Sequence, residues 1–184
     1  MPSARVRILL VRHGESVLGR ARRYAGHRDT PLTAAGRRQI RRLRARFRRF
    51  RADVLFTSDL RRCRQTAALL APGRDVHATP RLRELDFGAW DGLTAEGCRR
   101  RDPARFARWM RNPGSTRPPG GESLGELRRR VRAFARSAVR RHAGKTLAFV
   151  THAGPIRALA SDDFWALTIK PGGMIEMTWR IRRP

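Results

Sequence analysis

The chain has 184 residues, 40% of them hydrophobic, with 42 lysines and arginines against 15 aspartates and glutamates, a formal net charge of +27. This length and apolar content suffice for one globular domain over residues 1–184. No apolar run approaches the ~20 residues of a membrane-spanning helix, and Cys63 and Cys98 match neither a disulfide framework nor a zinc site, so we expect a cytoplasmic protein and no membrane contact.

Strands are predicted where short apolar runs occur. The run at residues 6–11 is continuous and ends in Arg-His-Gly, which is typical of a buried parallel strand that delivers a polar loop. Similar runs predict strands at 54–57 and 146–150. We expect another short strand at 75–79 and a final edge strand at 174–181.

Helices with one apolar face are predicted between these strands. The first begins after Thr33, and we expect Ser58 or Asp59 to cap the next, in which Cys63 is a core thiol. Two short helices fill residues 93–112, and Asp102 followed by Pro103 opens the second of them.

A loop rich in proline and glycine, residues 113–121, precedes the last long helix, which Ser123 and Glu126 open with the spacing of a capping box. Strands therefore alternate with helices along the whole chain. This order is typical of an α/β fold with a mostly parallel sheet. We see no internal repeat and no linker that would divide the chain.

The positive charge has two interpretations. Of the 42 basic residues only Lys145 and Lys170 are lysines, so 40 are arginines. A field of this sign attracts phosphate-rich polymers, and nucleic acid bound without sequence preference is one possible partner. Within residues 36–51, however, Ile40 and Phe47 belong to an apolar stripe and arginines fill the other positions. That pattern favours an ordinary solvent-facing helix surface.

Ionisable or hydroxyl side chains follow three of the predicted strands. They are Arg12-His13-Gly14, Thr57-Ser58 and Thr151-His152. Ligands of such sheets bind beyond the carboxyl ends of the strands, so two histidines at two strand ends indicate one site. Arg-His-Gly alone carries little weight in a chain so rich in arginine.

Several further motifs stand in a fixed order around these histidines. They are Arg12-His13-Gly14-Glu15-Ser16, Tyr24-Ala25-Gly26-His27, Thr30-Pro31-Leu32-Thr33, Thr57-Ser58-Asp59-Leu60-Arg61-Arg62, Leu82-Arg83-Glu84-Leu85, Gly120-Gly121-Glu122-Ser123 and Thr151-His152-Ala153-Gly154-Pro155. This series resembles the histidine phosphatase superfamily, which includes the cofactor-dependent phosphoglycerate mutases. The resemblance implies their three-layer sandwich, with helices on both faces of the sheet.

The resemblance also implies roles for individual residues. His13 would be the nucleophile that forms a phosphohistidine, and Glu84 the acid that protonates the leaving oxygen. Arg12, Arg62 and His152 would bind the phosphoryl oxygens. The positions expected to contact the rest of the substrate are Ser16, Tyr24, Gly26 and His27. The family requires no metal or other cofactor for this hydrolysis.

Within the superfamily the motifs most resemble α-ribazole phosphatase, which dephosphorylates a nucleotide precursor of cobalamin. A general small-molecule phosphatase and a phosphoglycerate mutase-like enzyme are the alternatives, and from another class a basic polyanion-binding protein on this fold. Two departures stand out: Gly19 replaces an asparagine of the family, and Asp162 and Asp163 interrupt a shortened last helix. The oligomeric state is open, with a homodimer as one possibility.

Overall fold

The computed structural model describes residues 5–180, which form a five-stranded sheet of order β3-β2-β4-β1-β5. Four strands are parallel, and β5 pairs antiparallel with β1 at one edge. The strands are β1 (Arg5–Arg12), β2 (Val54–Ser58), β3 (His77–Thr79), β4 (Leu147–Thr151) and β5 (Met174–Arg180). The mostly parallel sheet is therefore confirmed; the expected end of the last strand at residue 181 lies outside the described residues.

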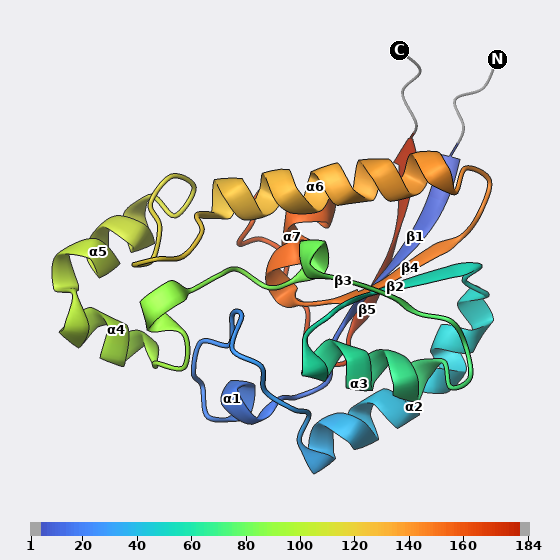
Figure 1. The fold of residues 1–184 in the computed structure, drawn as a ribbon, viewed down its shortest axis with the longest axis horizontal. Coiled ribbons are helices and arrows are strands. Elements are labelled where there is room, and N and C mark those ends of the chain that lie inside the picture. The colour runs from blue at the N-terminus through green and yellow to red at the C-terminus, as the bar shows by residue number, and fades with distance from the viewer. Residues whose placement is uncertain (1–4, 181–184) are drawn as a thin grey trace.

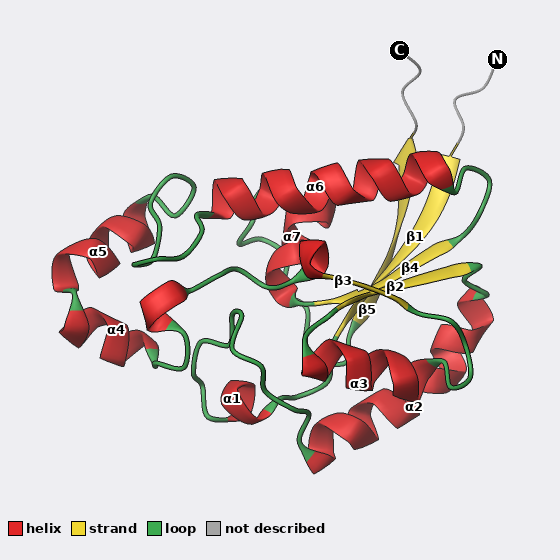
Figure 2. Ribbon diagram, viewed as in Figure 1, coloured by secondary structure: helices red, strands yellow, loops and turns green. Residues whose placement is uncertain are grey.

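Helices cover both faces of this sheet (Figures 1 and 2). On one face lie α2 (Ala34–Phe50) and α3 (Arg61–Leu70); on the other lie α6 (Leu124–Arg141) and α7 (Ala153–Ala160). The alternation of side chains in a strand explains the two layers of core. In β1, Ile8 and Leu10 join the α6 side and Leu9 and Val11 the α2 side. The expected three-layer sandwich is confirmed.

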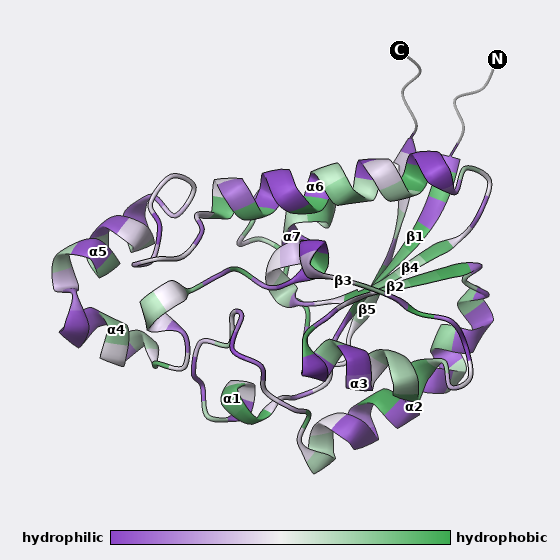
Figure 3. Ribbon diagram, in the orientation of Figure 1, coloured by the Kyte–Doolittle hydropathy of each residue, from purple (hydrophilic) through white to green (hydrophobic). Residues whose placement is uncertain are grey.

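Figure 3 shows the same division in hydropathy, with apolar central strands and helices whose apolar and polar residues alternate around the axis. The two short helices expected within residues 93–112 are α4 (Ala95–Arg101) and α5 (Pro103–Arg111), and they extend away from the sheet (Figure 1). They carry Trp109, which packs edge-on against Trp90 at 5.9 Å between ring centroids. The sequence did not indicate α1 (Val17–Arg20) or the single 3₁₀ turns η1 (Pro80–Leu82) and η2 (Gly88–Trp90).

Most of the expected caps form. Thr33 caps α2, Asp102 caps α5 with Pro103 in its first turn, and Ser123 and Glu126 make both bonds of a capping box. The prediction that Ser58 or Asp59 caps α3 was wrong.

The N-cap of α3 is Leu60, which has no side-chain capping bond. The two polar side chains expected there contact other groups: Ser58 Oγ lies 3.0 Å from His152 Nε2, and Asp59 forms an ion pair with Arg83.

The segment after His152 is short, as the sequence suggested. Helix α7 has eight residues and ends at Ala160. Asp163 then forms a local turn in which its Oδ1 accepts from Trp165 N at 2.9 Å, which leaves Phe164 buried and Trp165 56% exposed. Within residues 5–180, no helix is both long and apolar enough to cross a membrane.

Candidate active site

The loop after β1 carries His13. The backbone N–H of His13 donates to the carbonyl of Thr151 at 2.9 Å, which continues the parallel pairing one residue past the strand. The next residue must be glycine, because a Cβ on Gly14 would stand 2.6 Å from the carbonyl oxygen of Gly36 at the start of α2. The loop is thus packed directly on a helix, and this contact fixes the position of His13.

One hydrogen bond sets the tautomer of His13. Its Nδ1 lies 2.7 Å from the carbonyl oxygen of Gly14, and a carbonyl oxygen can only accept. We therefore assign the proton to Nδ1. In the neutral ring, this leaves the lone pair on Nε2.

The ring of His152 faces that of His13, with 5.0 Å between centroids and an angle of 68° between planes. Arg62 Nε donates to Nδ1 of His152 at 3.2 Å, so Nδ1 is an acceptor and the proton of the neutral ring is on Nε2. That proton is directed at Ser58 Oγ, 3.0 Å away. Both ring nitrogens of His152 therefore have partners within the protein.

Burial keeps both histidines neutral at neutral pH. It lowers the pKa of His13 to about 3, and the positive charges of Arg62 and then Arg12 add to this, against the hydrogen bond to Gly14. The pKa of His152 is lowered well below its ordinary value, first by burial and then by the charge of Arg62. A neutral imidazole is the form that can act as a nucleophile.

Arg62 is fully buried, and most of its N–H groups donate to acceptors within the protein. Besides the bond to His152, it donates from Nη1 to Arg28 O at 3.0 Å and from Nη2 to Ala25 O and Gly26 O at 2.9 and 2.7 Å. Of its five N–H groups, this leaves one on Nη1 for another acceptor. The expected contact of Arg62 with a phosphoryl group stays a prediction, and this one N–H is the donor left for it.

Arg12 and Glu84 complete the group. Arg12 donates from Nη1 to Ile169 O at 2.5 Å, while its buried Nε has no partner among the described residues. Burial lowers the pKa of Arg12, and the negative charge of Glu84 opposes that shift. Arg12, His13, Arg62, Glu84 and His152, far apart in sequence, therefore meet at the carboxyl ends of β1 and β4.

The carboxylate of Glu84 lies on the N-terminus of α7. Its Oε1 accepts from the backbone N–H of Gly154 at 3.0 Å and from that of Leu85 at the same distance. A Cβ on Gly154 would stand 2.1 Å from this oxygen. Gly154 therefore supplies a donor and also the space that the carboxylate occupies.

The four residues expected to contact substrate all have partners in the protein. Ser16 is buried and caps α1, and Tyr24 stacks on Phe87 at 4.3 Å. Gly26 accepts from Arg62, and His27 Nε2 donates to Glu84 O at 3.1 Å. Their contact with substrate stays a prediction.

Three more residues border the site, and the sequence assigned none of them a role in catalysis. Ser58 was taken for a helix cap; Cys63, taken for core, has its sulfur 3.4 Å from His152 Nε2. Asp91 holds the loop over the site by accepting from Gly26 N and Arg28 N at 2.9 and 2.7 Å. Its place in Trp90-Asp91-Gly92 was the available signal. Across residues 5–180, no three His, Cys, Asp or Glu side chains are grouped so as to hold a metal ion.

Known proteins resemble this chain in both sequence and structure. Residues 8–179 match the model of the histidine phosphatase superfamily (branch 1). Phosphoserine phosphatase 1 of Hydrogenobacter thermophilus is 33% identical over 156 residues, 84% of this chain and 74% of that protein. A bifunctional protein of Mycobacterium tuberculosis is 38% identical over 83% of this chain, which spans 43% of its length. The crystal structure of the α-ribazole phosphatase from Shigella flexneri superposes with a TM-score of 0.83 at 28% identity, covering 92% of this chain and 89% of that one.

The buried neutral histidines predict that acid destabilises the fold. Between about pH 6.5 and the lowered pKa of His13, unfolded histidine takes up a proton that the folded ring does not, so the free energy of unfolding falls as the pH falls, by at most about 1.4 kcal/mol per pH unit for each such group. His13→Asn removes one of them. Urea unfolding at about pH 7 and about pH 5 should show a smaller loss in this variant than in the wild type; equal losses would contradict the neutral burial of His13.

Proposed function

The chain belongs to the histidine phosphatase superfamily, and from this premise we propose that it hydrolyses phosphomonoesters through a phosphohistidine on Nε2 of His13. The observation that carries the proposal is the hydrogen bond from His13 Nδ1 to the carbonyl of Gly14. It holds the proton on Nδ1 and leaves the Nε2 lone pair free beside Arg12 and His152.

In the first step, His13 Nε2 attacks phosphorus while the bond from phosphorus to the ester oxygen breaks. Arg12, with its unpartnered Nε, and the remaining N–H of Arg62 offer charge and donors to the phosphoryl oxygens. The N–H at Nε2 of His152 is directed at Ser58 Oγ and can also donate to the same phosphoryl oxygens. Glu84, in its protonated form, gives its proton to the departing oxygen, so the alcohol leaves neutral.

In the second step, water attacks the phosphohistidine. The carboxylate of Glu84 takes a proton from this water, the bond between Nε2 and phosphorus breaks, and inorganic phosphate leaves. His13 returns neutral and Glu84 returns protonated, so the cycle closes with no further reactant. Positioning and charge stabilisation contribute most of the catalysis in phosphoryl transfer.

The substrate we propose is a small phosphomonoester, with α-ribazole 5'-phosphate as first candidate. The similarity to the α-ribazole phosphatase of Shigella flexneri supports it. Phosphoserine is the next candidate, because the relative from Hydrogenobacter thermophilus carries that activity in its name. A panel with both compounds and 3-phosphoglycerate separates these branches by relative kcat/KM.

The phosphohistidine predicts a trappable intermediate. With a ³²P-labelled phosphomonoester and EDTA, acid-sensitive and base-stable label should appear on the protein within one turnover. His13→Asn keeps a donor toward Gly14 O but has no nucleophilic nitrogen, so both label and hydrolysis should vanish. Full hydrolysis by this variant would refute the proposal.

Gly154→Ala tests whether catalysis depends on the position of the Glu84 carboxylate against the N-terminus of α7. The added Cβ would meet Glu84 Oε1, so the carboxylate must move, and a displacement of about 1 Å can lower kcat on the order of 100-fold for an alkyl phosphate. Gly97→Ala is the matched control: it also lies in the first turn of a helix, where its Cβ would have 3.3 Å to Thr94 Oγ1. Undiminished kcat in Gly154→Ala would contradict this placement of the acid.

A second candidate function is polyanion binding by α2. Seven arginines of this helix are exposed, the helix contains no acidic residue, and no ion pair to them occurs among the described residues. Arg38, Arg42 and Arg49 are spaced by four and seven residues, so they share one face, opposite the buried Ile40 and Phe47. We propose that this face binds nucleic acid without sequence preference.

Arg38, Arg42 and Arg49, all changed to Gln, should weaken binding to duplex DNA and flatten its dependence on salt, because fewer phosphate contacts release fewer counterions. The control changes Arg99, Arg100 and Arg105 to Gln. It removes the same charge from side chains already paired with Glu96 and Asp102. DNA affinity is measured by fluorescence anisotropy. If the two triple variants weaken binding equally, binding depends on net charge alone, and the proposed face of α2 is contradicted.

A further inference from the structure

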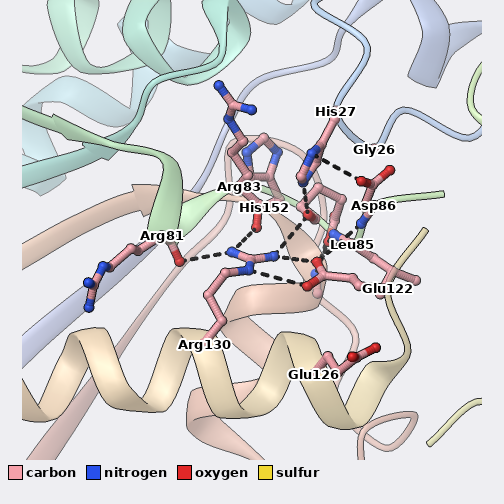
Figure 4. A network of polar contacts seen from close by, with 12 residues as sticks. Gly26, His27, Arg81, Arg83, Leu85, Asp86, Glu122, Glu126, Arg130 and His152 are labelled. Atoms are coloured by element: carbon pink, nitrogen blue, oxygen red, sulfur yellow. Dashed lines mark hydrogen bonds and ion pairs between the residues drawn. The ribbon is translucent and has the colours of Figure 1, made fainter. Parts of the chain in front are cut away.

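Arg130 of α6 directs three of its five N–H donors at the short segment 81–84. Its Nη1 donates to Arg81 O at 2.9 Å and Arg83 O at 3.1 Å, and its Nη2 to Glu84 O at 3.2 Å (Figure 4). The other two donors go to the carboxylate of Glu122. With all five N–H groups committed, no donor of Arg130 is left for a ligand.

Glu122 joins the same segment from the other side. Its Oε1 accepts from Asp86 N at 3.1 Å, and its own backbone N–H donates to Asp86 O at 3.0 Å. The side chains of Arg130 and Glu122 are only 24% and 17% exposed, so the pair is weakly screened by water. Figure 4 shows the guanidinium between this carboxylate and the three carbonyls.

The segment held in this way is the backbone that carries Glu84. Thr151 Oγ1 anchors it two residues earlier by donating to Leu82 O at 2.6 Å, and His27 Nε2 shares Glu84 O with Arg130. The residues between η1 and η2 form no regular element, so no ladder of backbone hydrogen bonds fixes them. The carbonyls of Arg83 and Glu84 accept from side chains instead.

We propose that Arg130, held by Glu122, is the positioning residue for Glu84: it fixes the backbone from which the carboxylate reaches the leaving oxygen, and so sets the rate of proton transfer. This inference rests on the role proposed above for Glu84. Within residues 5–180, Arg130 makes no hydrogen bond to His13 or His152, and its hydrogen bonds reach Glu84 through the backbone of the segment 81–84. Its charge also contributes to the lowered pKa of His152, and Arg130→Lys keeps that charge.

Lysine cannot replace this arginine. Its single ammonium keeps the charge but cannot span three carbonyls and a carboxylate with the fixed geometry of a guanidinium. Arg130→Lys should therefore loosen the segment. Arg129→Lys, at the exposed neighbouring position of the same helix, is the matched control.

The experiment measures the rate of phosphoenzyme formation in a single turnover with two substrates. 4-Nitrophenyl phosphate has a leaving group that departs without a proton; the alkyl phosphate that the wild type hydrolyses fastest needs the acid. Arg130→Lys should slow the alkyl phosphate on the order of 10- to 100-fold and leave the nitrophenyl ester nearly unchanged. Arg129→Lys should alter neither rate.

Equal slowing of both substrates, or of neither, would overturn the positioning role. Absence of phosphoenzyme in the wild type would instead refute the proposed function itself, whatever Arg130 does. Circular dichroism and urea unfolding check that each variant folds. If Arg130→Lys does not fold, Glu122→Gln tests the same role. This variant keeps an oxygen that accepts from Asp86 N but loses the charge that faces Arg130. It should slow the alkyl phosphate more than the nitrophenyl ester, by a smaller factor than Arg130→Lys.

Discussion

Arg12 lies opposite Thr151 in the parallel pairing of β1 with β4, and the place of both histidines follows from that register. Each histidine is the next residue after its strand, so the two rings emerge side by side at one edge of the sheet. A slip of one residue would turn every side chain of β1 to the opposite face and reverse its apolar layers. The packing that holds the core therefore also holds the site.

The site also depends on the charge state of its histidines. A chain of this charge offers many cations to a phosphate, yet the nucleophile must stay uncharged. Burial provides most of that effect, and the neighbouring guanidiniums add to it. Arg62 contributes to the low pKa of both rings while its donors hold the backbone at residues 25–28. One side chain thus sets the charge of the site and the shape of the loop above it.

Hydrophobic periodicity was enough to predict the strands, the principal helices and the layers, because burial in this fold follows regular spacing. The pairing of the histidines followed from the strand-end rule. The partners of Ser58 and Arg62 could not be predicted, since they depend on how irregular segments fold over the sheet. Arg130 stands in a run of three arginines at 128–130; its only signal was its place three residues after the buried Leu127, at the border of the apolar stripe.

The scarce acidic residues behave unlike the abundant basic ones. Of the 15 aspartates and glutamates, 14 accept a hydrogen bond or ion pair, and Asp75 is the exception within the described residues. Several bind backbone N–H groups of loops and helix starts, as Asp91 and Asp53 do. Substitutions should therefore be tolerated unequally in this protein: exposed arginines without partners can be exchanged at little cost to the fold, while a carboxylate that holds backbone N–H groups, such as Asp91 or Asp53, cannot.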